Sequence, residues 1–188
     1  VAFSVEETEQ IIKAGAQYGL KPKIHTNQFN CMGGIELCVA NNALSVDHLE
    51  VVNDAEIECL KNSETIATLL PSAPFFLSDP YQPGRKLVDE GVAVALASDY
   101  NPGSSPSGNM NLVVSLACVK LKMTPEEAIN AATINGAFAM ELQNEYGSIA
   151  VGKKANLMIT EEINSLAFIP YSFGKDSIEQ VIINGKII

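Results

Sequence analysis

The sequence predicts an α/β fold built around a parallel sheet. Short apolar segments alternate with segments of helical period through residues 1–142, an order typical of strand–helix units. Residues 92–97 are apolar throughout, as expected of a strand that is covered on both faces. After residue 142 the segments become β-rich, and an Asn-Gly pair at residues 184–185 indicates a hairpin. We therefore expect an α/β part followed by a small antiparallel β part.

The expected elements can be placed one by one. Strands are expected at residues 21–25, 43–48, 65–70 and 92–97. Helices are expected from residue 5 to the region of residue 19, and at residues 35–41, 53–61, 82–90, 111–122 and 125–140. Two capping boxes, Ser4-x-x-Glu7 and Thr124-x-x-Glu127, mark helix starts, because in each the two side chains satisfy one another's backbone N–H groups. Gly136 is an expected weak point inside the last helix.

The composition restricts the function. A net charge of −10 argues against nucleic acid or an anionic membrane as the partner, because both bind basic surfaces. Neither an apolar run of about 18 residues nor a signal peptide is visible, so no membrane span is expected. The four cysteines are scattered without a C-x-x-C pair, which favours free thiols in a reducing cytoplasm over a disulfide framework.

The only two histidines of the chain and one aspartate stand at equivalent positions. His25 and His48 each end an expected strand, and Asp99 follows the apolar strand at residues 92–97, where an Asn-Pro-Gly turn begins. Each residue taken alone is better explained as a hydrogen-bonded core or rim residue. Because the carboxyl ends of parallel strands meet at one edge, the three together indicate one site. Imidazole and carboxylate are ordinary ligands of zinc and non-haem iron. Such an ion activates water, which predicts metal-assisted hydrolysis.

The segments that carry these residues resemble the amidohydrolase superfamily. They are Ile24-His25-Thr26-Asn27-Gln28-Phe29, Ser45-Val46-Asp47-His48-Leu49, Ala97-Ser98-Asp99-Tyr100-Asn101-Pro102-Gly103-Ser104 and Met123-Thr124-Pro125-Glu126-Glu127-Ala128. The resemblance covers essentially all 188 residues. It implies the C-terminal half of a (β/α)8 TIM-like barrel, about four βα units, in residues 1–142, and the C-terminal part of a small β-sandwich domain in residues 143–188. The superfamily's first metal motif, His-x-His, has no counterpart before residue 25, so we expect a part of a longer enzyme that is inactive alone.

Within the superfamily, the sequence is similar to the hydrolases of histidine degradation that open the ring of 4-imidazolone-5-propanoate to give N-formimino-L-glutamate. This similarity implies one zinc or iron ion held by His25 and Asp99, with Asp99 also accepting the proton of the attacking water. His48 is implied to face the substrate carbonyl. The implied substrate-binding residues are Gln28, Asn101, Gly103 and Ser104.

Two other functions remain open at this stage. The first is a related deaminase that acts on a cyclic amidine or a nucleobase. Such deaminases carry Glu where Gln28 stands, and because Gln cannot shuttle a proton, this residue argues against deamination. The second is a non-catalytic fragment that binds itself. Half a barrel exposes two strand edges, so we expect a homo-oligomer, with a small-molecule substrate as the other partner.

Overall fold

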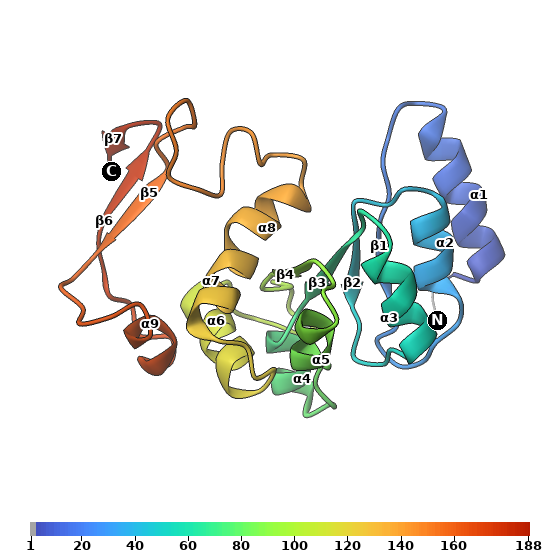
Figure 1. The fold of residues 1–188 in the computed structure, drawn as a ribbon, viewed down its shortest axis with the longest axis horizontal. Helices are drawn as coiled ribbons and strands as arrows, with labels where there is room; N and C mark the ends of the chain where they lie inside the picture. Colours follow the sequence, from blue (N-terminus) through green and yellow to red (C-terminus); the bar gives the residue numbers. More distant parts are fainter. Residues whose placement is uncertain (1–2) are drawn as a thin grey trace.

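The computed structural model describes residues 3–188, and its elements alternate along the chain (Figure 1). The first part contains α1 (Val5–Ala16), β1 (Lys23–Thr26), α2 (Gly34–Ala40), β2 (Ser45–His48), α3 (Asp54–Lys61), β3 (Ile66–Leu69), α4 (Ser72–Leu77), α5 (Gly84–Asp89), β4 (Val94–Leu96), α6 (Met110–Val119), α7 (Pro125–Ala132) and α8 (Ile134–Phe138). The second part contains β5 (Leu157–Thr160), α9 (Phe168–Tyr171), β6 (Ile178–Ile183) and β7 (Lys186–Ile187).

The strands of the first part form one parallel sheet in the order β1-β2-β3-β4. Thr26, His48, Leu69 and Leu96 occupy matching positions on successive strands. The carboxyl ends of the strands therefore form one even edge, and Asp99 follows three residues beyond it. The α/β class and the parallel sheet are confirmed.

One face of this sheet packs against helices to form the hydrophobic core. Side chains of the strands pack there against α2, α3, α5, α6 and α7, and among the fully buried ones are Ile35, Leu60, Leu69, Leu87 and Val113. Each large apolar side chain buried in this way contributes about 1.5–3 kcal/mol. Because strand side chains alternate, the next residues face the other side, where His25, Asp47, Thr68 and Ala95 line a cavity.

Three helices, α1, α3 and α7, begin with a capping box. In each, a side chain at the N-cap accepts a hydrogen bond from a backbone N–H group, and a Glu three residues later accepts one in return. The pairs are Ser4 with Glu7, Asn53 with Glu56, and Thr124 with Glu127. The two capping boxes expected from the sequence are thus confirmed, and Asn53 completes a third.

Two expectations about helices are wrong. The helix expected at residues 125–140 is broken at Thr133, whose φ of −121° and ψ of −88° are not helical, whereas Gly136 lies inside α8. The break lets Asn135 Nδ2 donate to the carbonyl of Val94 at 2.8 Å, which ties α8 to β4. In addition, α4 was not expected, because Pro71 at the end of the third strand indicates only a stop.

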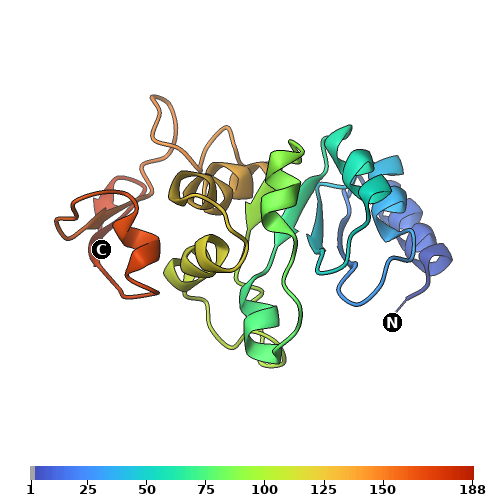
Figure 2. The same ribbon diagram turned by 60° about the horizontal axis from the view of Figure 1, so that its bottom comes forward.

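The second part is a small antiparallel sheet in the order β5-β6-β7. Asn184 and Gly185 have φ of 50° and 78°, as the expected Asn-Gly hairpin requires. This part meets the first where α9 packs on α6, and Asn109 Nδ2 donates to the carbonyl of Gly174 at 2.9 Å. Figures 1 and 2 both place it at the end of the molecule opposite α1. Within residues 3–188, no helix is at once long and apolar enough to span a bilayer.

Candidate metal and catalytic site

Three side chains converge at the carboxyl edge of the parallel sheet. His25 lies near the end of β1, His48 is the last residue of β2, and Asp99 follows β4. Each offers one ligand atom, and these atoms all lie within 4.8 Å of one another. The structure thus brings together the three residues that the sequence places at strand ends.

The backbone is unusual at this edge. His48, Leu49 and Asp99 have φ of 91°, 65° and 52°, in the left-handed region that side chains other than Gly rarely adopt. Such conformations cost about 1–3 kcal/mol each and persist only where the surrounding structure holds them. Leu49 is fully buried, and its packing fixes the sharp turn that follows His48.

The two imidazole rings are in direct contact. His48 Nε2 lies 3.1 Å from His25 Nδ1, and the rings meet edge to face with their centroids 4.9 Å apart. The other ring nitrogens face carboxylates: His48 Nδ1 lies 3.4 Å from Glu50 Oε1, and His25 Nε2 lies 3.6 Å from Asp47 Oδ2. The side chain of His48 is 5% exposed and that of His25 is 62% exposed, so His48 has the drier environment.

The charges around His48 favour its protonated form. Burial acts to lower its pKa, because desolvation disfavours a charged ring. The hydrogen bond and charge of Glu50 act in the opposite direction, and the charges of Asp99 and Asp47 add to them. The net result is a pKa above the ordinary value for histidine.

The loop after Asp99 is held together by one amide side chain. Asn101 Nδ2 donates to the carbonyl of Asp99 at 2.6 Å and to Ser104 Oγ at 2.8 Å. Asn101 Oδ1 accepts from the backbone N–H groups of Gly103 and Ser104 at 2.8 and 2.9 Å. Ser104 Oγ in turn donates to Asp99 Oδ2 at 3.0 Å. Three of the expected substrate-binding residues therefore form a closed network that orients the carboxylate of Asp99.

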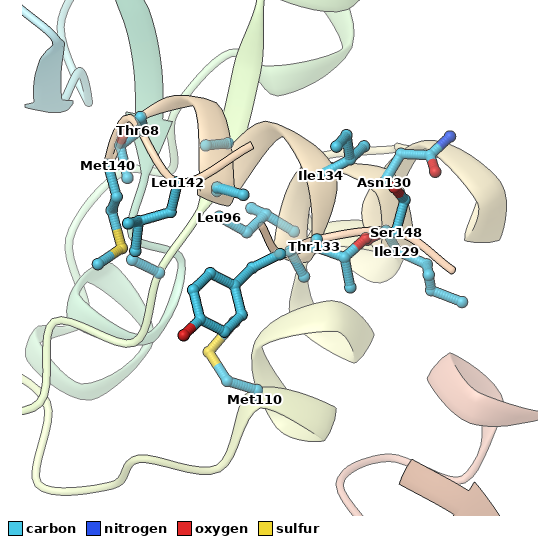
Figure 3. A pocket seen from close by; sticks show the side chains of 18 of the residues that line it. Thr68, Leu96, Met110, Ile129, Asn130, Thr133, Ile134, Met140, Leu142 and Ser148 are labelled. Carbon is cyan, nitrogen blue, oxygen red and sulfur yellow. The ribbon is translucent and has the colours of Figure 1, made fainter. Parts of the chain in front are cut away.

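Two hollows open beside the site. The larger, of about 1320 Å³, runs along the inner face of the sheet and includes His25 and Asp99. Its wall is mostly apolar where α8 and the following segment cover it, as the side chains of Ile134 and Leu142 in Figure 3 show. Gln28 lines the smaller hollow, of about 600 Å³, together with His25 and His48. His25, His48, Asp99 and Gln28 thus line one or both of the hollows, which share His25. Of the other expected residues, Asn101, Gly103 and Ser104 line neither hollow.

The donor set fits a metal ion. Two ligands of zinc, each about 2.0–2.2 Å from the ion, lie at most about 4.4 Å apart. The candidate atoms of His25, His48 and Asp99 lie within 4.8 Å, so adjustments of a few tenths of an ångström are enough for them to share an ion. Two imidazoles and a carboxylate suit zinc or iron equally.

Sequence reasoning missed four polar residues next to the site. Asp47 accepts from Ser45 Oγ at 2.7 Å, and Glu50 accepts from Gln82 Nε2 at 2.7 Å. Thr68 is buried on the cavity side of β3. Asp47 and Glu50 flank His48 in the sequence and could have been noticed as acids close to an expected site residue. Nothing in the sequence around Gln82 indicates its role.

Known proteins resemble this chain over its full length. The family model described as "Amidohydrolase family" matches residues 1–188. Curated relatives named imidazolonepropionase, from Christiangramia forsetii and Flavobacterium johnsoniae, are 61% and 62% identical over 186 residues. One from Treponema denticola is 44% identical over 187 residues. Each match covers 99% of this chain and 45% of the relative, so the chain spans less than half the length of these relatives.

Solved structures share the fold at low sequence identity. A zinc-bound adenosine deaminase from Xanthomonas campestris matches 98% of this chain and 48% of its own, with a TM-score of 0.85 and 20% identity. Guanine deaminase from E. coli matches 97% of this chain and 51% of its own, with a TM-score of 0.80 and 15% identity. These likenesses establish the fold alone: a part of a TIM-type barrel with a small additional sheet.

Proposed function

The chain belongs to the amidohydrolase family, and on that premise we propose that it supplies part of the active site of an imidazolonepropionase. The reaction is the hydrolysis of 4-imidazolone-5-propanoate to N-formimino-L-glutamate. The observation that carries the proposal is the convergence of His25, His48 and Asp99 within 4.8 Å at the carboxyl edge of a parallel sheet. Because the chain spans 45% of its relatives, the activity is proposed for the whole protein.

Each of the three residues has a role that its chemistry allows. When bound, a zinc or iron ion held by His25 and Asp99 lowers the pKa of water close to neutrality. Asp99 accepts the proton that the attacking water loses as its oxygen adds to the ring carbonyl. Protonated His48 donates a hydrogen bond from Nε2 to the carbonyl oxygen as negative charge develops there. The ring C–N bond then breaks, the nitrogen takes up a proton, and the former carbonyl becomes a carboxylate.

Four residues are proposed to hold the substrate or product. Gln28 can offer an amide donor and acceptor to the ring from the side of His48. Asn101, Gly103 and Ser104 surround Asp99 in a loop rich in polar groups, which suits the propanoate chain and the amide-like atoms.

Ring opening is favoured over deamination by two observations. The relatives at 61% and 62% identity both carry the name imidazolonepropionase, whereas the deaminases resemble the chain only in fold. Gln28 also lacks the proton-shuttling carboxyl group that a deaminase needs. The two reactions can be told apart directly, because deamination releases ammonia and ring opening does not.

We also propose a domain division and a cellular setting. Residues 1–142 would form the barrel part and residues 143–188 the part of a small β-sandwich domain. The edges at β1 and β4 would pair with further protein, another copy of the chain included. A single, monodisperse monomer in light scattering would contradict self-association. Four free cysteines support a cytoplasmic setting.

A chimera tests the proposed function. This chain would replace the matching 186 residues of the Christiangramia forsetii relative, and the chimera would be loaded with zinc or with iron. We expect the substrate's ultraviolet absorbance to decay and N-formimino-L-glutamate to appear. Asp99→Ala should abolish turnover, whereas Asp89→Ala, at the exposed end of α5, should leave it unchanged.

Two outcomes would overturn the proposal. One is a folded, metal-loaded chimera that does not open the ring. The other is a chimera in which Asp99→Ala retains turnover close to that of the parent.

A further inference from the structure

A buried carboxylate lies behind His48, on the side away from His25. The side chain of Glu50 is 3% exposed, and its Oε1 lies 3.4 Å from His48 Nδ1. Gln82, from the segment before α5, is also buried, and its Nε2 donates to the same Oε1 at 2.7 Å. Within residues 3–188, Glu50 Oε2 and Gln82 Oε1 have no hydrogen-bond partner. A buried carboxylate with so few partners is costly unless a cation or a strong donor faces it.

The geometry restricts where the hydrogen of neutral His48 can lie. A carboxylate only accepts, so a hydrogen bond between Glu50 and the ring requires the hydrogen on Nδ1. The opposite arrangement is a chain that runs toward Asp47, with hydrogens on His48 Nε2 and His25 Nε2. In that arrangement His48 Nδ1 has no hydrogen and faces the buried carboxylate of Glu50. The hydrogen bond gained in exchange runs from His25 Nε2 to Asp47 Oδ2, at 3.6 Å, and belongs to the more exposed ring of His25. Because electrostatic interactions are stronger at the drier position, Glu50 has the larger influence.

We propose that Glu50, held in place by Gln82, is a positioning residue that keeps the hydrogen of neutral His48 on Nδ1. The ring nitrogen without a hydrogen is then Nε2, which lies 3.1 Å from His25 Nδ1. The inference rests on the proposed function for the role of His48, and it adds a residue that acts through the ring. A purely structural alternative is that Glu50 only joins the loop after β2 to the loop before α5.

Nitrogen NMR of the 188-residue chain separates these accounts. The chain has only two histidines, so each ring nitrogen can be assigned after labelling with ¹⁵N and ¹³C. The spectra are recorded without metal or substrate, at a pH above which the ring shifts no longer change. The ¹⁵N shifts then report which nitrogen of His48 carries the hydrogen.

We expect neutral His48 in the parent chain to be protonated on Nδ1. Glu50→Leu should lose the Nδ1–H signal and gain one on Nε2, where His25 Nδ1 can accept at 3.1 Å. Glu50→Gln should keep the Nδ1–H signal, because its amide oxygen still accepts. This rescue by the conservative variant would not be expected if Glu50 merely filled space.

Several results would overturn the inference. A hydrogen on Nε2 of neutral His48 in the parent chain would contradict the inference by itself. The test therefore does not depend on whether Glu50→Leu folds. An unchanged His48 tautomer in a folded Glu50→Leu variant would show that another group sets it. This result and that of the chimera assay are independent. An active chimera together with the Nε2 tautomer in the 188-residue chain would contradict this inference alone. An inactive chimera together with the Nδ1 tautomer would contradict the proposed function alone.

Discussion

Replacing Asn101 with alanine should weaken metal binding without unfolding the protein. The side chain of Asn101 holds the carbonyl of Asp99 and, through Ser104, its carboxylate. In the variant, the backbone N–H groups of Gly103 and Ser104 also lose their acceptor, but the loop is partly exposed and water can replace it. The loss should therefore be confined to the orientation of Asp99.

The size of the affinity loss depends on the two hydrogen bonds that Asn101 Nδ2 donates, one to the carbonyl of Asp99 and one to Ser104 Oγ, which in turn contacts the Asp99 carboxylate. Each hydrogen bond contributes about 0.5–1 kcal/mol net, so their loss should cost about 1–2 kcal/mol of the free energy of metal binding. Since 1.4 kcal/mol corresponds to a tenfold change in affinity, the dissociation constant for zinc should rise about 5- to 30-fold. Changes of this size are typical when a group that orients a metal ligand is removed.

Isothermal titration of zinc into the parent chain and into Asn101→Ala measures the effect. Ser107→Ala is the matched control, because the Ser107 hydroxyl lies in the same loop and accepts only from the N–H of Asn109. The control should bind zinc as the parent does. An Asn101→Ala variant with unchanged affinity, and with an unchanged unfolding transition, would refute the idea that this amide orients Asp99.

Three further predictions concern the fold. Glu127→Ala removes both a capping partner and the forked contact with Arg85, so unfolding in urea should show a loss of about 1–2 kcal/mol at pH 7. Arg85 lowers the pKa of Glu127 in the folded state, so this stabilisation is present above about pH 4.5 and should disappear as the pH falls through the lowered pKa. A stability difference between parent and Glu127→Ala that persists in acid would contradict this prediction. Burial raises the pKa of Cys38 to about 12, so a thiol reagent should modify exposed Cys31 in the native state and Cys38 only after unfolding, as peptide mapping would show. Leu69→Ala, at a fully buried position of β3, should cost about 2–5 kcal/mol in the same urea experiment, and a loss below 1 kcal/mol would mean that the core there is not close-packed.

The site was predictable because its residues stand at strand ends. An apolar strand can be identified from a few consecutive residues, and the residue that ends it must lie at the edge of the sheet. His25, His48 and Asp99 could therefore be grouped without coordinates. Glu50 stands close to His48 in the sequence, but its contact with Gln82 could not be predicted. That contact joins two loops that are 32 residues apart, and no local pattern determines the path of either loop.

The errors in the fold also have physical causes. The helical pattern of residues 125–140 is continuous, and only the tertiary hydrogen bond from Asn135 to Val94 reveals why the helix breaks at Thr133. The short α4 was missed because Pro71 is a strong stop signal for the strand before it and says little about the conformation of the residues after it. Local propensity thus predicted element types well and tertiary adjustments poorly.

The central claim is that His25, His48 and Asp99 form one site, in which His25 and Asp99 hold the metal ion and His48 lies beside it. Its most direct test is to add zinc to the ¹⁵N-labelled 188-residue chain and to follow both imidazole rings by NMR. We expect zinc to shift the ring nitrogens of His25 and His48 together, with weak affinity, and we expect Asp99→Ala but not Asp89→Ala to remove the shifts. Zinc that leaves either ring unchanged, or that binds equally well to Asp99→Ala, would contradict the account.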